Sequence, residues 1–91
     1  MSTPSGKIEL YTTLFCPFCI RAKQLLDSKG VMYYETDVTT RLSLRKAMTE
    51  RAGGRTSVPQ IFIDGQHIGG CNDLLALERS GQLDRLLQVA C

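Results

Sequence analysis

The sequence predicts an α/β domain in which a mixed four-stranded sheet carries helices on both faces. Strand-like and helix-like hydrophobic patterns follow one another in the order β-α-β-α-β-β-α, with one more helix at the end. The strand–helix–strand beginning implies a parallel pair of strands with a right-handed crossover. Asp64-Gly65, between the last two strands, is a strong hairpin signal and adds an antiparallel pair.

The first strand and the first helix are expected over residues 7–13 and 17–29. In the first of these segments apolar and charged side chains alternate, which is typical of a half-buried strand. In the second, apolar positions recur with helical spacing on one face. Pro17 suits the first helical turn, where its missing N–H costs nothing, and Gly30 suits the end of the helix.

The second strand is expected over residues 31–38, which are rich in tyrosine and valine. Thr39 or Thr40 can cap a second helix, which would run to about residue 52 before Gly53-Gly54 ends it. Three apolar side chains of this helix are expected to face inward: Leu44, Ala47 and Met48.

The third and fourth strands are expected over residues 58–63 and 66–68, on either side of the hairpin turn. Gly69-Gly70 then interrupts the regular structure. Helical periodicity returns at about residues 72–80 and 82–89.

The chain has 91 residues, enough for one core, and residues 1–91 are expected to form a single domain with a flexible polar segment at 1–6. Its net charge is +2 and its basic residues are scattered, so no nucleic-acid binding is expected. The sequence contains neither the apolar core of a signal peptide nor an apolar run of about 18 residues. No membrane association is therefore expected. We therefore expect a cytoplasmic protein, in a compartment where thiols are kept reduced. A monomer is also expected.

Cys16-Pro17-Phe18-Cys19 is the most informative motif. The strand before it and the helix after it place Cys16 at a helix N-terminus, where free N–H groups and the helix dipole favour a thiolate. Cys19 follows one turn later, close enough to close a disulfide. A thiolate that can attack, beside a thiol that can resolve, is a dithiol redox couple. Such a pair near a β-α-β pattern indicates a redox site, and a reducing compartment disfavours a structural disulfide.

Val58-Pro59 opens the third strand and permits two interpretations. A trans proline would simply begin the strand, because proline has no N–H to give to the ladder. A cis peptide bond would turn the backbone groups of Val58 toward an extended peptide, which could pair there as an extra strand would. The cysteine pair upstream favours the cis form.

Gly69-Gly70-Cys71-Asn72-Asp73 also permits two interpretations. The glycines allow a close approach of the backbone, and the helix that follows presents free N–H groups suited to a carboxylate. Asp73 could hold an ammonium group beside that carboxylate, which would fit the α-amino acid end of a glutamyl group. The alternative is a plain glycine turn with an Asn or Asp cap.

In this order, the motifs resemble those of the glutaredoxins over about residues 7–87. The resemblance rests on residues 16–19, 56–63 and 67–74, and it is closest to the small bacterial dithiol members, which share the Ile-Gly-Gly-Cys stretch. It implies a thioredoxin fold. It also implies a thiol-disulfide oxidoreductase that uses glutathione as co-substrate.

The resemblance further implies a role for individual residues. Cys16 would be the nucleophile, and Cys19 would resolve the intermediate. The backbone of Val58 would pair with the cysteine part of glutathione, and Asp73 with neighbouring N–H groups would bind the γ-glutamyl end. The full set of expected glutathione-binding residues is Thr13, Pro17, Phe18, Lys46, Ser57, Val58, Pro59, Gly70, Cys71, Asn72 and Asp73.

Two positions depart from the family pattern. Thr13 stands where a lysine is usual, three residues before the nucleophile. That lysine helps to bind the glycine carboxylate of glutathione and to stabilise the thiolate. Its absence either weakens both contributions or shifts them to Lys46 or Arg45 on the second helix. Phe18 stands where tyrosine is commoner, which removes a hydroxyl and keeps the ring. The other aromatic residues are expected in the core or at the rim of the site: Tyr11, Phe15, Tyr33, Tyr34 and Phe62.

The expected partners are glutathione, proteins that carry disulfides or glutathione adducts, and, indirectly, glutathione reductase with NADPH.

No metal is expected, because Cys71 and Cys91 do not form the second cysteine pair of a structural zinc site. The alternative is a 2Fe-2S cluster held between two subunits by Cys16 and glutathione, although Pro17 is typical of members that favour catalysis. A third alternative is a thioredoxin-type protein that is reduced by a reductase rather than by glutathione. It is disfavoured, because a Cys-Gly-Pro-Cys motif is absent. His67 is expected to be a surface or packed histidine.

Overall fold

The structure is a computed structural model that describes residues 7–87. Its strands are β1 (Ile8–Thr12), β2 (Tyr34–Asp37), β3 (Gln60–Ile63) and β4 (Gln66–Gly69). Its helices are α1 (Pro17–Ser28), α2 (Leu42–Arg51), α3 (Cys71–Ser80) and α4 (Gln82–Leu87). The expected flexible segment 1–6, Cys91 and the predicted end of the last helix lie outside the described residues. In the described part of the chain, no helix is long and apolar enough to span a membrane.

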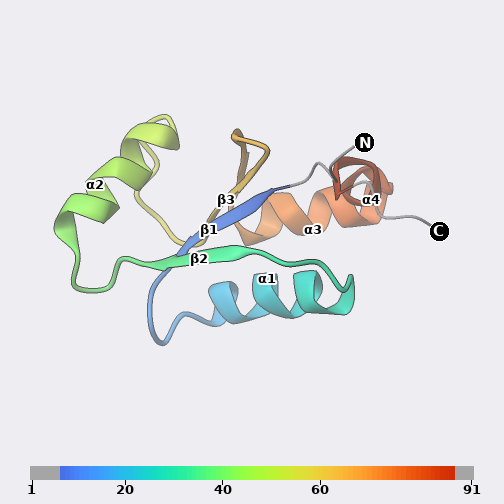
Figure 1. Cartoon of the computed structure of the whole chain (residues 1–91), viewed down its shortest axis with the longest axis horizontal. Coiled ribbons are helices and arrows are strands. Elements are labelled where there is room, and N and C mark those ends of the chain that lie inside the picture. The colour runs from blue at the N-terminus through green and yellow to red at the C-terminus, as the bar shows by residue number, and fades with distance from the viewer. Residues whose placement is uncertain (1–6, 88–91) are drawn as a thin grey trace.

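The four strands form one mixed sheet in the order β2-β1-β3-β4 (Figure 1). β1 pairs in parallel with β2 and in antiparallel orientation with β3. β3 and β4 form an antiparallel hairpin. Asp64 and Gly65 have φ angles of 53° and 81°, and two positive φ angles are what a two-residue hairpin turn of this kind requires. Both strand pairings inferred from the sequence are therefore confirmed.

The main core lies on one face of the sheet. Side chains alternate across a strand, so every second residue of β1 and β3 points toward α1, α3 and α4. The buried cluster contains Ile8, Leu10, Ala22, Leu26, Ile61, Ile63, Cys71, Leu74, Leu83 and Leu87. Phe62 faces the opposite side, where the guanidinium carbon of Arg51 from α2 lies 4.0 Å from its ring centre. Helices thus cover both faces, as predicted.

The second strand is shorter than predicted. Its pairing with β1 covers Tyr34–Asp37, whereas the sequence pattern predicts a strand over residues 31–38. Val31 and Tyr33 pack against the core without joining the ladder. Their apolar character reflects burial next to the core rather than strand pairing.

The second helix begins later than predicted. It starts at Leu42, and neither Thr39 nor Thr40 caps it. The Thr39 hydroxyl instead donates to Asp37 Oδ1 at 2.6 Å and accepts from the Leu14 N–H at 2.8 Å, so it joins two loops. The side chains of this helix that were expected to face inward are buried in one case, Met48, and partly buried in two, Leu44 and Ala47.

Candidate active site

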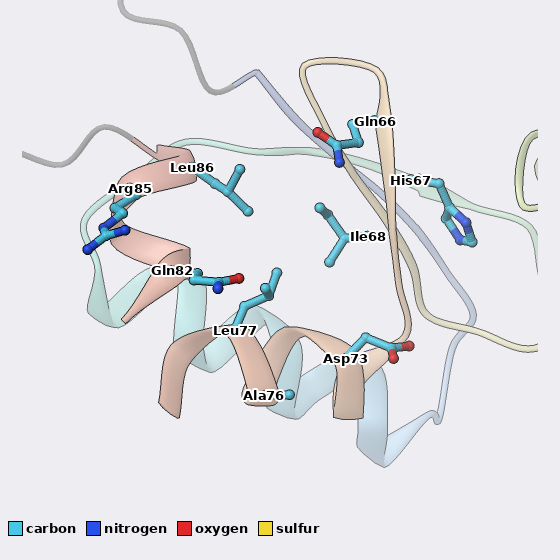
Figure 2. A pocket seen from close by; sticks show the side chains of 9 residues that line it. All are labelled: Gln66, His67, Ile68, Asp73, Ala76, Leu77, Gln82, Arg85 and Leu86. Atoms are coloured by element: carbon cyan, nitrogen blue, oxygen red, sulfur yellow. The ribbon is translucent and has the colours of Figure 1, made fainter. Parts of the chain in front are cut away.

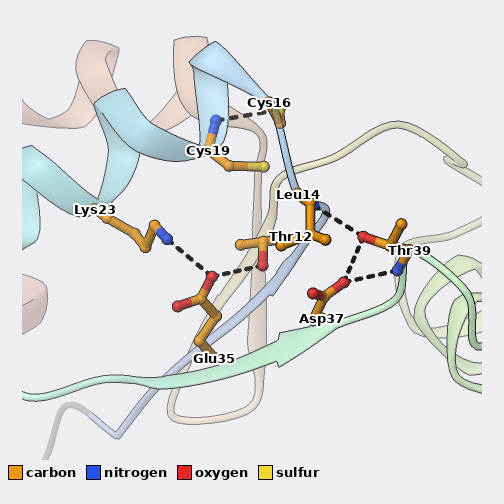
Figure 3. Close-up of polar contacts among 8 residues, drawn as sticks. All are labelled: Thr12, Leu14, Cys16, Cys19, Lys23, Glu35, Asp37 and Thr39. Atoms are coloured by element: carbon orange, nitrogen blue, oxygen red, sulfur yellow. Dashed lines mark hydrogen bonds and ion pairs between the residues drawn. The ribbon is translucent and has the colours of Figure 1, made fainter.

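The cysteine pair lies where β1 leads into α1 (Figure 3). Cys16 is the N-cap of α1 and has an extended backbone, and Pro17 follows as the first helical residue. The Cys19 N–H donates to Cys16 Sγ at 3.3 Å. The sulfur thus occupies the place of a capping oxygen, at the positive end of the helix dipole. The sulfur therefore lies where the helix presents its free N–H groups.

The two cysteines differ in exposure. Cys16 is partly exposed, whereas Cys19 is 1% exposed. Burial, reinforced by the Cys16 side chain, raises the pKa of Cys19 to about 12, although a hydrogen bond from the Thr13 backbone and the charge of Lys23 act to lower it. Cys19 therefore keeps its proton at neutral pH. An accessible sulfur beside a buried thiol suits attack by Cys16 and a later internal reaction of Cys19.

A polar cluster lies beneath the cysteine pair (Figure 3). Thr12, which is 1% exposed, donates its hydroxyl to Glu35 Oε2 at 2.7 Å, and Lys23 Nζ lies 3.0 Å from the same oxygen. Lys23 follows Cys19 by four residues, so the two side chains share one face of α1. Burial acts to raise the pKa of Glu35, but the hydrogen bonds from Thr12 and Lys23 outweigh it and lower that pKa. The cluster therefore holds an ion pair near the buried thiol.

A groove of about 190 Å³ opens beside Cys16. Val58 forms part of its wall, the peptide bond from Val58 to Pro59 is cis, and the Val58 carbonyl oxygen lies 3.9 Å from Cys16 Sγ. The cis form favoured by the sequence is therefore confirmed. The residues that line the groove are Phe18, Arg55, Ser57, Val58, Pro59, Gly70, Cys71, Asn72 and Asp73. Three motifs that lie far apart in the sequence thus meet at one place.

Asp73 organises the part of the groove formed by α3. Its Oδ2 accepts from the Gly70 N–H at 2.8 Å and from Arg55 at 3.2 Å, and these two interactions, Gly70 first, lower the pKa of the carboxyl. Gly69 has a φ of +124°, and a Cβ there would collide with the Asp73 carboxylate, so this position needs glycine. Because Gly70 already donates to Asp73, the donors left for an anion are the other free N–H groups in the first turn of α3.

Two polar residues at or near the site, Arg55 and Gln60, were given no role from the sequence. Arg55 lines the groove and pairs with Asp73, and its place just before the Val58-Pro59 motif is too weak a signal to reveal this. Gln60 is fully buried and donates to the Ser57 carbonyl at 2.9 Å, which holds the loop before the cis proline. Its Oε1 lies 2.7 Å from Nε2 of His67, which was expected to be a surface or packed histidine and is partly buried. A polar residue in an apolar strand was the available signal for Gln60.

Some of the expected glutathione-binding residues do not line the groove; they are Thr13, Pro17 and Lys46. Lys46 is exposed on α2 and forms no ion pair within residues 7–87. Arg45, the other basic residue expected to replace the usual lysine, donates to the Thr56 carbonyl at 2.9 Å. In the part of the chain that the structure describes, the basic residue that the fold brings into the groove is Arg55.

A larger cavity of about 600 Å³ lies between β4, α3 and α4 (Figure 2). Asp73 borders both cavities, but no cysteine of residues 7–87 lines the larger one. Cys71 is buried, and burial raises the pKa of its thiol. Among the described side chains, no group of three His, Cys, Asp or Glu residues is placed to hold a metal ion. The accessible sulfur chemistry of the described chain therefore lies at the smaller groove.

Comparison with known sequences agrees with the motifs. The glutaredoxin family model matches residues 8–68, which include the cysteine pair and Val58-Pro59. The chain is 54% identical over 83 residues to glutaredoxin 3 of Escherichia coli strain K12, which covers 91% of this chain and 99% of that protein. It is 52% identical over 82 residues to a glutaredoxin of Pseudomonas aeruginosa, which covers 90% of this chain and 96% of that protein.

Comparison with solved structures agrees with the fold. The solution structure of glutaredoxin from Brucella melitensis has a TM-score of 0.84 and 45% identity, and the match covers 98% of this chain and 96% of that one. The crystal structure of a buckwheat glutaredoxin–glutathione complex has a TM-score of 0.84 and 28% identity, with 91% and 77% coverage. The thioredoxin fold expected from the motifs is confirmed.

Proposed function

The chain belongs to the glutaredoxin family, and on that basis we propose that it is a glutathione-dependent oxidoreductase that reduces protein disulfides and protein–glutathione mixed disulfides. Thiol-disulfide oxidoreductase activity in general follows from the family. The observation that carries the proposal is the position of Cys16, whose sulfur caps α1 and lies 3.9 Å from the Val58 carbonyl at the edge of the groove. One structural relative is a glutaredoxin–glutathione complex, which supports glutathione as the ligand.

In the proposed reaction, the Cys16 thiolate attacks the glutathione sulfur of a protein–glutathione mixed disulfide. The bond between the protein sulfur and glutathione breaks, a Cys16–glutathione disulfide forms, and the protein thiolate leaves and takes up a proton. The thiolate of a second glutathione then attacks the glutathione sulfur of this adduct. Oxidised glutathione is released and the Cys16 thiolate is restored.

With a protein disulfide, the first attack leaves a disulfide between Cys16 and the substrate protein. Cys19 then gives up its proton and attacks the Cys16 sulfur, which releases the second protein thiol and forms the Cys16–Cys19 disulfide. Two molecules of glutathione reduce this disulfide and leave as one molecule of oxidised glutathione. Because the pKa of Cys19 is raised to about 12, its proton must be removed during this internal step.

Glutathione is proposed to lie along the groove. The backbone of Val58 pairs with its cysteine part as an added strand would. Free N–H groups in the first turn of α3 bind the γ-glutamyl carboxylate, and Asp73 binds the adjacent ammonium. Arg55, which pairs with Asp73, supplies positive charge within the groove. The remaining walls of the proposed site are Phe18, Ser57, Pro59, Gly70, Cys71 and Asn72.

The proposal is tested by the reduction of a cysteine–glutathione mixed disulfide, coupled to NADPH and glutathione reductase. The wild-type protein is expected to accelerate NADPH oxidation only when glutathione is present. No acceleration with glutathione, or equal acceleration without it, would contradict the proposal. A brown protein after anaerobic purification, together with negligible turnover, would instead favour the 2Fe-2S alternative, in which Cys16 of each of two chains holds the cluster.

Cys19→Ser is expected to separate the two reaction routes. Turnover of the mixed disulfide should stay near the wild-type rate, since only Cys16 reacts there. Reduction of a protein disulfide should slow by about tenfold or more, because an external thiol must replace the internal attack. Both rates are measured in the same coupled assay. Equal losses on the two substrates would contradict the role assigned to Cys19.

Arg55→Gln and Lys46→Gln test which basic residue serves glutathione. Arg55→Gln is expected to raise KM for the mixed disulfide by about fivefold with little change in kcat, because it removes one charge-assisted hydrogen bond. Lys46→Gln, the matched control on α2, should leave both constants unchanged. The reverse pattern would support Lys46, the residue suggested by the sequence. Urea unfolding should show similar stability, since the half-exposed Arg55–Asp73 ion pair contributes at most about 1 kcal/mol.

The cellular setting is proposed on the same basis. The protein would act as a single-domain monomer in the cytoplasm. Its electrons would come from glutathione and, indirectly, from NADPH through glutathione reductase. Its substrates would be proteins that carry disulfides or glutathione adducts.

A further inference from the structure

Phe15, the residue before Cys16, is 97% exposed, more than any other large apolar side chain among residues 7–87. Its φ is 55°, in the left-handed region that bulky residues seldom adopt. Leu14, directly before it, is 58% exposed. Unfavourable backbone conformations and exposed apolar side chains are each found preferentially at functional sites. Here both occur next to an accessible sulfur.

The loop that carries Phe15 is held in place from outside the β1–α1 connection. The Leu14 N–H donates to Thr39 Oγ1 at 2.8 Å, across 25 residues of sequence. Thr39 is itself fixed by Asp37, whose Oδ1 accepts from the Thr39 N–H at 2.8 Å and from the hydroxyl at 2.6 Å (Figure 3). The backbone that presents Phe15 to solvent is therefore fixed by hydrogen bonds to residues outside this turn.

Phe15 and Leu14 lie outside the proposed glutathione groove. Phe18, two residues after Cys16, lines the groove, whereas Leu14 and Phe15 do not. A mixed disulfide has two halves joined at the reacting sulfurs. If glutathione fills the groove, the protein half has to leave Cys16 along another side. Leu14 and Phe15, which are both apolar, directly precede Cys16 in the chain.

We propose that Phe15, supported by Leu14, binds an apolar side chain next to the reacting cysteine of the protein half and so selects among glutathionylated proteins. This inference rests on the proposed function, which brings such a cysteine to Cys16. The occupant is a polypeptide with a leucine-like residue beside its modified cysteine. Apolar contact is the available attraction, because neither Phe15 nor Leu14 carries a polar side chain.

Met32, an exposed apolar side chain far from Cys16, provides a control. Met32 is 86% exposed and follows the C-terminal end of α1. Cys16 caps the opposite end of that 12-residue helix, which is roughly 18 Å long. Met32→Asn therefore removes a comparable exposed apolar side chain far from the sulfur.

The experiment compares two glutathionylated peptides that differ only in having leucine or serine beside the modified cysteine. The measured quantity is the ratio of their kcat/KM values, so a general change in activity cancels. Wild type and Met32→Asn are expected to prefer the leucine peptide by about tenfold, a typical gain from partly burying such a side chain. Phe15→Asn, which tolerates the left-handed conformation, should bring the ratio close to one. Phe15→Tyr, which keeps the ring, should restore it.

The outcomes separate this inference from the proposed function. Equal use of the two peptides by the wild-type protein, with normal turnover of the small cysteine–glutathione disulfide, overturns the role of Phe15 and leaves the proposed function standing. Absence of glutathione-dependent turnover on every substrate overturns both. A preference that persists in Phe15→Asn also overturns the inference. The inference is also overturned if sedimentation shows a wild-type dimer that dissociates in Phe15→Asn, because a second copy of the chain would then cover Leu14 and Phe15.

Discussion

Replacing Cys16 with serine is expected to reduce turnover of the cysteine–glutathione disulfide by a factor on the order of 10³ or more, as loss of an enzyme nucleophile does elsewhere. The thiolate is the species that attacks a disulfide, and a serine hydroxyl does not ionise near neutral pH or exchange with disulfides. The substitution is nearly isosteric, and Cys16 is only partly buried, so the fold should persist. The coupled NADPH assay measures the loss.

Two controls make the Cys16 result specific. Thermal unfolding of Cys16→Ser should match the wild-type protein, which separates lost chemistry from lost structure. Turnover that survives in Cys16→Ser but disappears when Cys71 is also replaced would assign the attack to Cys71. Burial and the raised pKa of Cys71 argue for the opposite order of reactivity.

Replacing Phe62 with alanine is expected to lower the free energy of unfolding by about 3–5 kcal/mol. Phe62 is 1% exposed, and its ring contacts Tyr11 at 5.8 Å and His67 at 5.0 Å between ring centres. The Arg51 guanidinium lies over the ring at 4.0 Å. Alanine would leave a cavity and remove these contacts together. For a domain of this size the Tm should fall by about 20 °C.

Urea unfolding and calorimetry would measure the Phe62 effect, with Phe62→Leu as the matched control. Leucine keeps much of the apolar volume, so the loss should shrink to roughly 1–2 kcal/mol. A Tm change of only a few degrees for Phe62→Ala would mean that the sheet face toward α2 contributes little to stability. Phe62 does not line the groove, so turnover measured well below the Tm should remain close to that of the wild-type protein.

Most of the fold could be predicted because each element depends on nearby residues. Alternation in residues 7–13 and helical spacing in 17–29 each constrain one element. Asp64-Gly65 accepts two adjacent positive φ angles, so the hairpin follows from two residues. The predicted starts of the second and third strands and of the second helix were wrong. Thr39 has the chemistry of a helix cap, but it bonds instead to Leu14, and no local pattern shows that choice.

The candidate site also has features that the sequence predicts and features that depend on long-range packing. The Cys16–Cys19 pair at a helix start follows from the amino-acid order, because the two residues are three apart and a strand precedes them. The expected cis peptide bond before Pro59 is present. Long-range packing, by contrast, decides which side chains share a cavity with these groups. It brings Arg55 rather than Lys46 into the groove.

The amino-acid order determines the family, the order of the elements and the place of the Cys16–Cys19 pair, since these depend on short spacings and local backbone preferences. The three-dimensional packing decides what those short spacings leave open. It places the Asp73 carboxylate where it accepts from the Gly70 N–H, buries Cys19 so that its pKa rises to about 12, and leaves the Phe15 side chain exposed. Each of these depends on atoms brought together by the whole fold, because burial and hydrogen bonding are properties of surroundings and not of neighbours in the chain.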